Sequence, residues 1–132
     1  MRSEEVGDLA ICARDLARAA GDLRAEFASR LLAGRHHLAR GQRAAASAEL
    51  DALLGLAEGG IASVDERLEL SGYHAESLVA LGNFGHAEWV LREGLNEVSS
   101  ETGSSRQVAR LLAQLAKVMH RRGETTDALY LE

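Results

Sequence analysis

Apolar residues recur at spacings of three and four along most of this chain, a pattern typical of amphipathic helices. One such stripe follows Gly82 and consists of Phe84, Ala87, Leu91, Leu95 and Val98. Gly82 can take the left-handed conformation that ends a helix, and the Asn83 side chain can cap the next helix. We therefore predict a tight turn here between two antiparallel helices.

The same periodicity predicts seven helical segments, at about residues 3–20, 22–40, 42–58, 63–81, 83–98, 104–122 and 125–132. Glycines are expected to end them at Gly21, Gly41, Gly59, Gly82 and Gly123. Serine starts two capping boxes, in residues 63–66 and 104–107. The last segment is short, and the final Leu131-Glu132 suggests a cloning remnant on a fragment of a larger protein.

The helix-ending glycines indicate a repeat of 41 residues, because Gly41, Gly82 and Gly123 are equally spaced. An alanine follows each glycine after five residues, at Ala46, Ala87 and Ala128. The helix before each glycine carries a small residue, at Gly34, Ala75 and Ala116. We expect these small residues to lie where the two helices of each unit cross.

These small residues and alanines, with large residues such as Leu50 and Leu91 four positions after the alanine, resemble the tetratricopeptide repeat family. The period is longer than the usual ~34 residues and the closing proline is absent, as in long-period variants. The resemblance implies an all-α fold, an α-hairpin solenoid of three units plus a leading helix. Its parts would be the leading helix 1–20 and repeats 22–60, 62–102 and 104–132, the last truncated.

Composition narrows the class of protein further. With 46% hydrophobic and only 4% aromatic residues and no proline, the core must be built from aliphatic side chains on helices. A net charge of −5 argues against nucleic-acid binding. The single cysteine, Cys12, is expected to be a small core residue. No apolar run suits a membrane span or a signal peptide, so we expect a soluble cytoplasmic protein without a membrane partner.

Candidate catalytic and metal-binding chemistry is sparse. His36 and His37 are adjacent and diverge by about 100° around a helix, while His74, His86 and His120 are each alone on a predicted helix. No serine stands in a nucleophile elbow and no glycine-rich phosphate loop occurs. We predict a protein that is not an enzyme and needs no metal or cofactor.

By resemblance, the first helix of each repeat lines a concave groove that binds a peptide or helix of another protein. The groove positions would be Leu31, Arg35, Leu38, Tyr73, Glu76, Val79, Arg110, Gln114, Lys117 and Arg121. Residues 106–122 hold five basic residues and no acidic one, which favours an acidic peptide as the partner. Alternatively, this run of basic residues could attract a neighbouring repeat of opposite charge and so hold the repeats together.

The alternative function is self-assembly with an empty groove. A helical repeat buries its apolar stripe only against a neighbour, and neither end of this chain carries a polar capping helix. We therefore expect a homodimer formed through the C-terminal unit, with Leu129 and Tyr130 in the contact.

Overall fold

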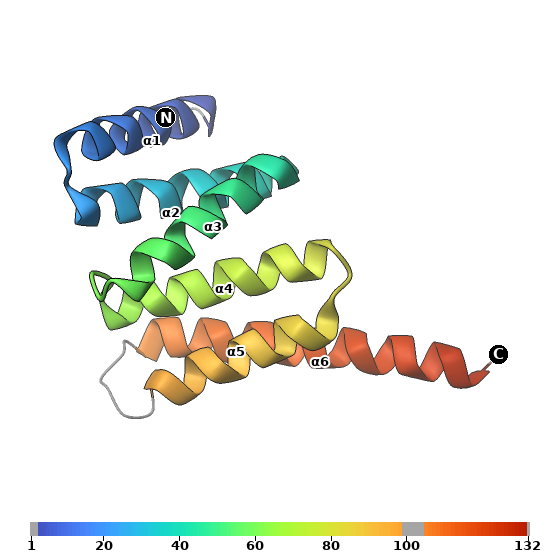
Figure 1. Ribbon diagram of the computed structural model, residues 1–132. Helices are drawn as coiled ribbons and strands as arrows, with labels where there is room; N and C mark the ends of the chain where they lie inside the picture. Colours follow the sequence, from blue (N-terminus) through green and yellow to red (C-terminus); the bar gives the residue numbers. More distant parts are fainter. Residues whose placement is uncertain (1–2, 99–104, 132) are drawn as a thin grey trace. The chain divides into compact units, whose positions relative to one another are not determined.

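The computed structural model describes residues 3–98 and 105–131, with side chains described within 4–97 and 105–123. In these ranges the chain is all-α, which confirms that part of the predicted fold class, while the α-hairpin solenoid stays a prediction (Figure 1). The helices are α1 (Ser3–Ala20), α2 (Leu23–Ala39), α3 (Arg43–Glu58), α4 (Val64–Ala80), α5 (Phe84–Val98) and α6 (Ser105–Leu131).

The chain divides into two compact units, Met1–Ser63 with α1 to α3 and Val64–Glu132 with α4 to α6. Consecutive helices pack on each other within each unit, and α4 also packs on α6. The division falls next to the predicted boundary between the first and second repeats, at residues 60–62. The repeat assignment itself stays a prediction.

The predicted turns at Gly21, Gly41 and Gly82 are confirmed, since these glycines have φ values of 71°, 73° and 78°. This left-handed region is accessible to glycine without the steric cost that a Cβ atom brings. Asp22 caps α2 by accepting a hydrogen bond from the Ala25 amide at 3.1 Å. Asn83 accepts one from the His86 amide at 3.3 Å. Local chemistry therefore fixes where these helices end.

The predicted turn at Gly123 is wrong, because α6 runs through this residue to Leu131. A glycine inside a helix costs only about 1 kcal/mol relative to alanine, so it does not force an end. The residue after Gly123 is Glu124. Gly21 and Gly82 are instead followed by Asp22 and Asn83, whose short side chains can cap a helix. The seventh helical segment is therefore not separate. The Leu129 and Tyr130 side chains lie outside the described residues.

The continuous helix also overturns the prediction for Ala116. This residue is exposed, whereas Gly34 and Ala75 are buried as expected. Ala116 was expected to face a helix folding back after Gly123, and that helix does not form. Leu111 and Val118 make the buried face of α6 instead.

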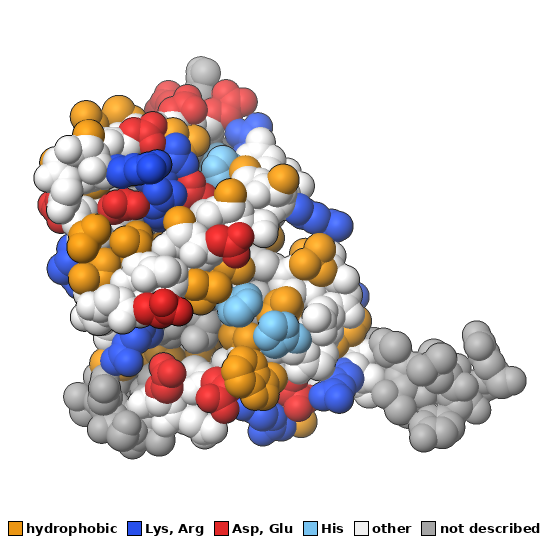
Figure 2. All heavy atoms as spheres, in the orientation of Figure 1, with side chains coloured by type: hydrophobic (Ala, Val, Ile, Leu, Met, Phe, Trp, Pro, Cys, Tyr) orange, Lys and Arg blue, Asp and Glu red, His pale blue; other side chains and the backbone are white. Residues whose placement is uncertain are grey.

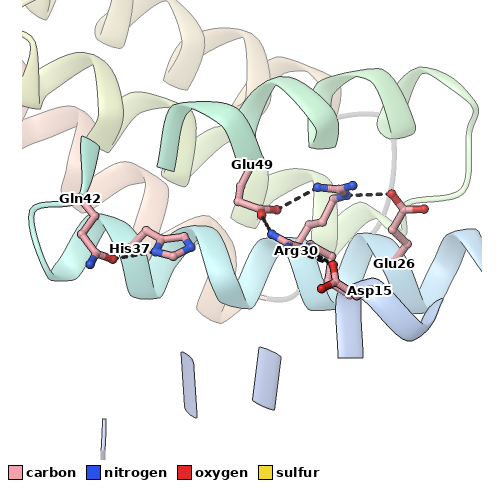
Figure 3. Close-up of polar contacts among 7 residues, drawn as sticks. Asp15, Glu26, Arg30, His37, Gln42 and Glu49 are labelled. Atoms are coloured by element: carbon pink, nitrogen blue, oxygen red, sulfur yellow. Dashed lines mark hydrogen bonds and ion pairs between the residues drawn. The ribbon is translucent and has the colours of Figure 1, made fainter. Parts of the chain in front are cut away.

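A network of charged side chains links the three helices of the first unit (Figure 3). Glu49 on α3, with a side chain only 5% exposed, accepts hydrogen bonds from Arg14 on α1 and from Arg30 on α2. Arg30 also pairs with Glu26 at 2.8 Å, and Arg14 with Asp15 at 2.9 Å. Burial lowers the pKa of Arg14, but its hydrogen bonds to Asp15 and Glu49 outweigh burial and raise it above the ordinary value. The guanidinium therefore stays charged.

Helix α1 buries small residues and leaves its leucines exposed. Ala10 and Ala17 are buried, while Leu9 and Leu16 are 57% and 66% exposed. Cys12 is exposed as well, so the expectation of a core cysteine is wrong. The small Gly7 also lies on the buried side, where an added Cβ would come within 2.5 Å of the His36 ring. Close approach of α1 and α2 selects small residues for the contact.

The core of the second unit is apolar. One cluster of buried residues draws on all three helices and consists of Leu68, Ala75, Ala87, Leu91, Leu111 and Val118. Phe84 and Leu95 pack against them, so the predicted stripe on α5 is confirmed within the described side chains. Gly94 brings α5 close to α4, since a Cβ there would lie 2.7 Å from the Ser71 hydroxyl.

Candidate functional site

A cavity of about 320 Å³ opens between α4 and α6 in the second unit. Its walls are Ala75, Glu76 and Val79 from α4 and Gln114, Lys117, Val118 and Arg121 from α6. The α6 residues recur at spacings of three and four, so one side of that helix faces the cavity. Ala75, fully buried at the helix contact, is small enough to leave the space open.

Gln114 is held against the backbone of α4. Its amide nitrogen donates to the Gly72 carbonyl at 3.2 Å and lies 3.5 Å from a Glu76 carboxylate oxygen. A Cβ on Gly72 would lie 2.7 Å from the Gln114 carbonyl oxygen. Glycine at this position therefore lets the amide reach the α4 backbone, and the contact fixes one polar wall of the cavity.

Two cations stand one helical turn apart on the same side of α6. The Arg121 guanidinium lies 5.2 Å from the centroid of the Phe84 ring, within cation–π range. Lys117 precedes it by four residues and is also exposed. Like charges at this spacing repel each other by a few tenths of a kcal/mol. An anion bound between them would remove that repulsion and accept hydrogen bonds from both.

The structure brings together only part of the predicted groove. Glu76, Val79, Gln114, Lys117 and Arg121 line the same cavity. Arg110 is exposed on α6 and Tyr73 is fully buried on α4, and neither lines it. Leu31, Arg35 and Leu38 lie on α2 in the first unit. A groove that runs through all three predicted repeats stays a prediction.

Residue spacing alone did not reveal an aromatic cluster on the second unit. The rings of His74 on α4 and His86 on α5 are edge to face, with centroids 5.7 Å apart. The Trp89 ring lies 5.8 Å from that of His86 and is 58% exposed as a residue. The sequence feature that could have indicated this cluster is the Gly82 turn, because it makes α4 and α5 neighbours. Residue spacing along a single helix could not indicate a contact between two helices.

His36 and His37 also share a site, although they diverge around α2. Both line a second cavity of about 300 Å³ in the first unit, with Glu4 and Asp8 from α1. His37 Nδ1 lies 2.7 Å from the Gln42 side-chain oxygen. Among the described residues, no group of three or more His, Cys, Asp or Glu side chains is arranged to hold a metal ion.

None of the helices, over their described residues, combines the length and apolar character needed to cross a membrane. Comparison with known protein families, with curated proteins and with solved structures gives no match to this chain.

Proposed function

We propose that this chain is a protein-binding module of the tetratricopeptide-like helical type. Its α4–α6 cavity takes a carboxylate-bearing peptide segment of a partner protein. The main support is that five residues predicted for a peptide groove line one cavity, namely Glu76, Val79, Gln114, Lys117 and Arg121. At about 320 Å³ the space lies at the small end of ligand pockets. It suits one or two anchoring side chains of a peptide.

The chemistry of the walls determines how such a segment would bind. Lys117 and Arg121 supply donors for a carboxylate, and Val79 supplies an apolar wall for a neighbouring side chain. Glu76 would repel an anion, so the carboxylate belongs at the Lys117–Arg121 side of the cavity. Donors of the peptide, such as an amide or hydroxyl group, belong beside Glu76.

The test uses an immobilised peptide array in which each Asp- or Glu-containing sequence is paired with its Asn or Gln counterpart. Peptides that bind the wild type and lose binding when amidated are then titrated against Lys117→Glu and Arg121→Glu. We expect each variant to bind at least ~10-fold more weakly, a loss of about 1.4 kcal/mol. Raising the salt concentration should also weaken wild-type binding.

The matched control is Arg110→Glu, because Arg110 is exposed on the same helix and does not line the cavity. It makes the same charge change as Arg121→Glu and should leave affinity within about twofold. Equal losses in all three variants would mean that binding is general electrostatic attraction. Undiminished binding by the two cavity variants would place the peptide elsewhere.

Self-assembly is the second candidate function, and the exposed apolar residues of α1 and α6 support it. The two functions use different sides of α6. Lys117 and Arg121 line the cavity, whereas Leu112 and Met119 are exposed and do not. One chain could therefore perform both.

A further inference from the structure

One wall residue of the α4–α6 cavity, Arg121, is in contact with an aromatic ring that lies outside that cavity. The central carbon of its guanidinium is 5.2 Å from the centroid of the Phe84 ring. Arg121 lines the cavity, whereas Phe84 does not. Any influence of the ring on a ligand in the cavity therefore passes through the arginine.

The place of the Phe84 ring is set by a turn and by the core of the second unit. Phe84 is the first residue of α5 and follows the left-handed Gly82. Asn83 accepts a hydrogen bond from the His86 amide, which fixes the start of the helix. The ring is half-buried and packs against the buried cluster. Packed side chains keep to defined rotamers, so the ring is a rigid support for a neighbouring group.

The next residue of α6, Arg122, contacts a different group on α5. Its guanidinium nitrogen lies 3.4 Å from a carboxylate oxygen of Glu88, which follows Phe84 by one helical turn. Figure 2 shows acidic and basic side chains interspersed over α5 and α6. Consecutive residues diverge by about 100° around a helix, and Arg122 does not line the cavity. Two adjacent arginines are therefore held by different chemistry, and only Arg121 faces a ligand.

The second cation of the cavity, Lys117, is not held in this way. It is exposed, and no hydrogen bond, ion pair or ring contact joins it to another described residue. An ammonium group is a hydrated point charge on a flexible stem, whereas a guanidinium is planar and presents its donors as a fork that matches a carboxylate. The two cations therefore suit different roles. Lys117 can attract an anion, and Arg121 can orient it.

Holding the arginine in advance should favour binding. A long exposed side chain loses conformational freedom when it binds a ligand, and that loss weakens affinity. A cation–π contact limits the freedom before the ligand arrives. The donors of a guanidinium lie at its edge, so contact between its central carbon and a ring leaves them able to bind a carboxylate.

We propose that Phe84 is a positioning residue, which holds Arg121 so that its guanidinium binds one carboxylate of the partner peptide through two parallel hydrogen bonds. The inference rests on the proposed function and adds the mode of recognition. Arg121 recognises the planar shape of the carboxylate, and Lys117 contributes charge.

The first part of the experiment uses substitutions that keep the charge of the cavity. The probe is an Asp- or Glu-containing peptide that the wild type binds and whose Asn or Gln counterpart it does not bind. Arg121→Lys removes the planar fork and should weaken binding about 5-fold or more. Lys117→Arg keeps the positive charge and should stay within about twofold. The matched control is Arg122→Lys, the same change on a residue that does not line the cavity.

The second part removes the ring. Phe84→Leu keeps an apolar side chain but no aromatic face, and should weaken binding about 2–5-fold, as expected for a cation–π contact at an exposed site. Phe84→Tyr keeps the ring and should bind like the wild type. In chains that already carry Arg121→Ala, Phe84→Leu should change affinity by less than about 1.5-fold, because the ring acts through the arginine.

Two measurements without peptide accompany the titrations. Circular dichroism verifies that each variant is folded. Proton NMR reports the contact itself, since the aromatic ring current shifts the Arg121 Hδ signals upfield. We expect this shift in the wild type and in Phe84→Tyr, and its loss in Phe84→Leu.

The contrary outcomes separate the two proposals. If no peptide binds the wild type, the proposed function fails and the positioning role fails with it. If the wild type binds but Phe84→Leu weakens binding equally with and without Arg121, or not at all, only the positioning role fails. Equal losses in Arg121→Lys and Lys117→Arg would mean that neither cation recognises the shape of the carboxylate. Absence of the ring-current shift in the wild type would overturn the positioning role whatever the peptides do.

Discussion

The two compact units hold three helices together by different means. In the first unit Glu49 lies between Arg14 and Arg30, and side chains from α1, α2 and α3 meet at this carboxylate. In the second unit α4, α5 and α6 meet at leucine, valine and alanine. Ion pairs require defined geometry and desolvation, whereas apolar contacts depend on volume and area. The two units have helices of similar length, but we expect them to respond differently to substitutions.

The largest effect is expected in the apolar core of the second unit. Leu111 is 1% exposed and contacts the buried cluster from α6. Leu111→Ala should lower the free energy of unfolding by about 2–5 kcal/mol, because it removes buried methyl groups and leaves a cavity. Urea unfolding measures the loss. Leu112→Ala is the control, since this neighbour is 52% exposed, and an equal loss there would contradict the packing of α6.

A smaller loss is expected when the ionic centre of the first unit is removed. Glu49→Ala leaves Arg14 with Asp15 and Arg30 with Glu26, so each arginine keeps one acidic partner. The cost should be about 2 kcal/mol, below the 3–5 kcal/mol typical of breaking a buried pair completely. Hydrogen exchange should show the loss in α1 to α3 first.

The control for this network is Asp15→Ala. Asp15 pairs with the same arginine, but its side chain is 62% exposed, and exposed ion pairs contribute about 0–1 kcal/mol. If Glu49→Ala costs no more than Asp15→Ala, the network does not stabilise the first unit and the contrast between the units disappears.

The smallest expected effects come from two helix glycines, one in each unit. Gly94 in the second unit has no room for a Cβ, because the Ser71 hydroxyl would lie 2.7 Å away. Gly55 in the first unit has nothing within 4 Å of that position. Gly94→Ala should destabilise the chain by about 1 kcal/mol, since overpacking at 1–3 kcal/mol exceeds the gain in helix propensity.

Gly55→Ala should stabilise the chain by about 0.5–1 kcal/mol, because only the gain in helix propensity remains. Thermal unfolding of the two variants gives shifts of opposite sign if this account holds. Stabilisation by Gly94→Ala would show that α4 and α5 can move apart without cost.

Much of the candidate site could be predicted because it lies on one helix. The spacing of Gln114, Lys117 and Arg121 places them on one side of α6 whatever surrounds it. Their meeting with Glu76 required the contact between α4 and α6. Tyr73 precedes Glu76 by three residues on α4 and was assigned to the groove, as they were, by the family resemblance, yet it is fully buried. Periodicity gave the helix and a broad face, but not the part of that face that a neighbour covers.

The sequence by itself determined where most helices begin and end. A helix is held by hydrogen bonds between residues four apart, and a glycine at Gly21 or Gly82 takes a left-handed φ through its own lack of a Cβ. These are local properties, so a local pattern predicts them. Gly123 shows where prediction from a local pattern fails. A single glycine costs a helix little free energy, so α6 continues through it.

Only the tertiary structure decided which side chains meet. Arg14 and Glu49 are 35 residues apart and Arg30 and Glu49 are 19 apart, and no helical spacing relates them. On α1 the contact with α2 favours Ala10 and Ala17 over Leu9 and Leu16, because helices approach most closely through small residues. The apolar stripe of a helix is wider than the line along which a neighbour touches it. The packing of other helices therefore decides which residues form the core and which remain exposed.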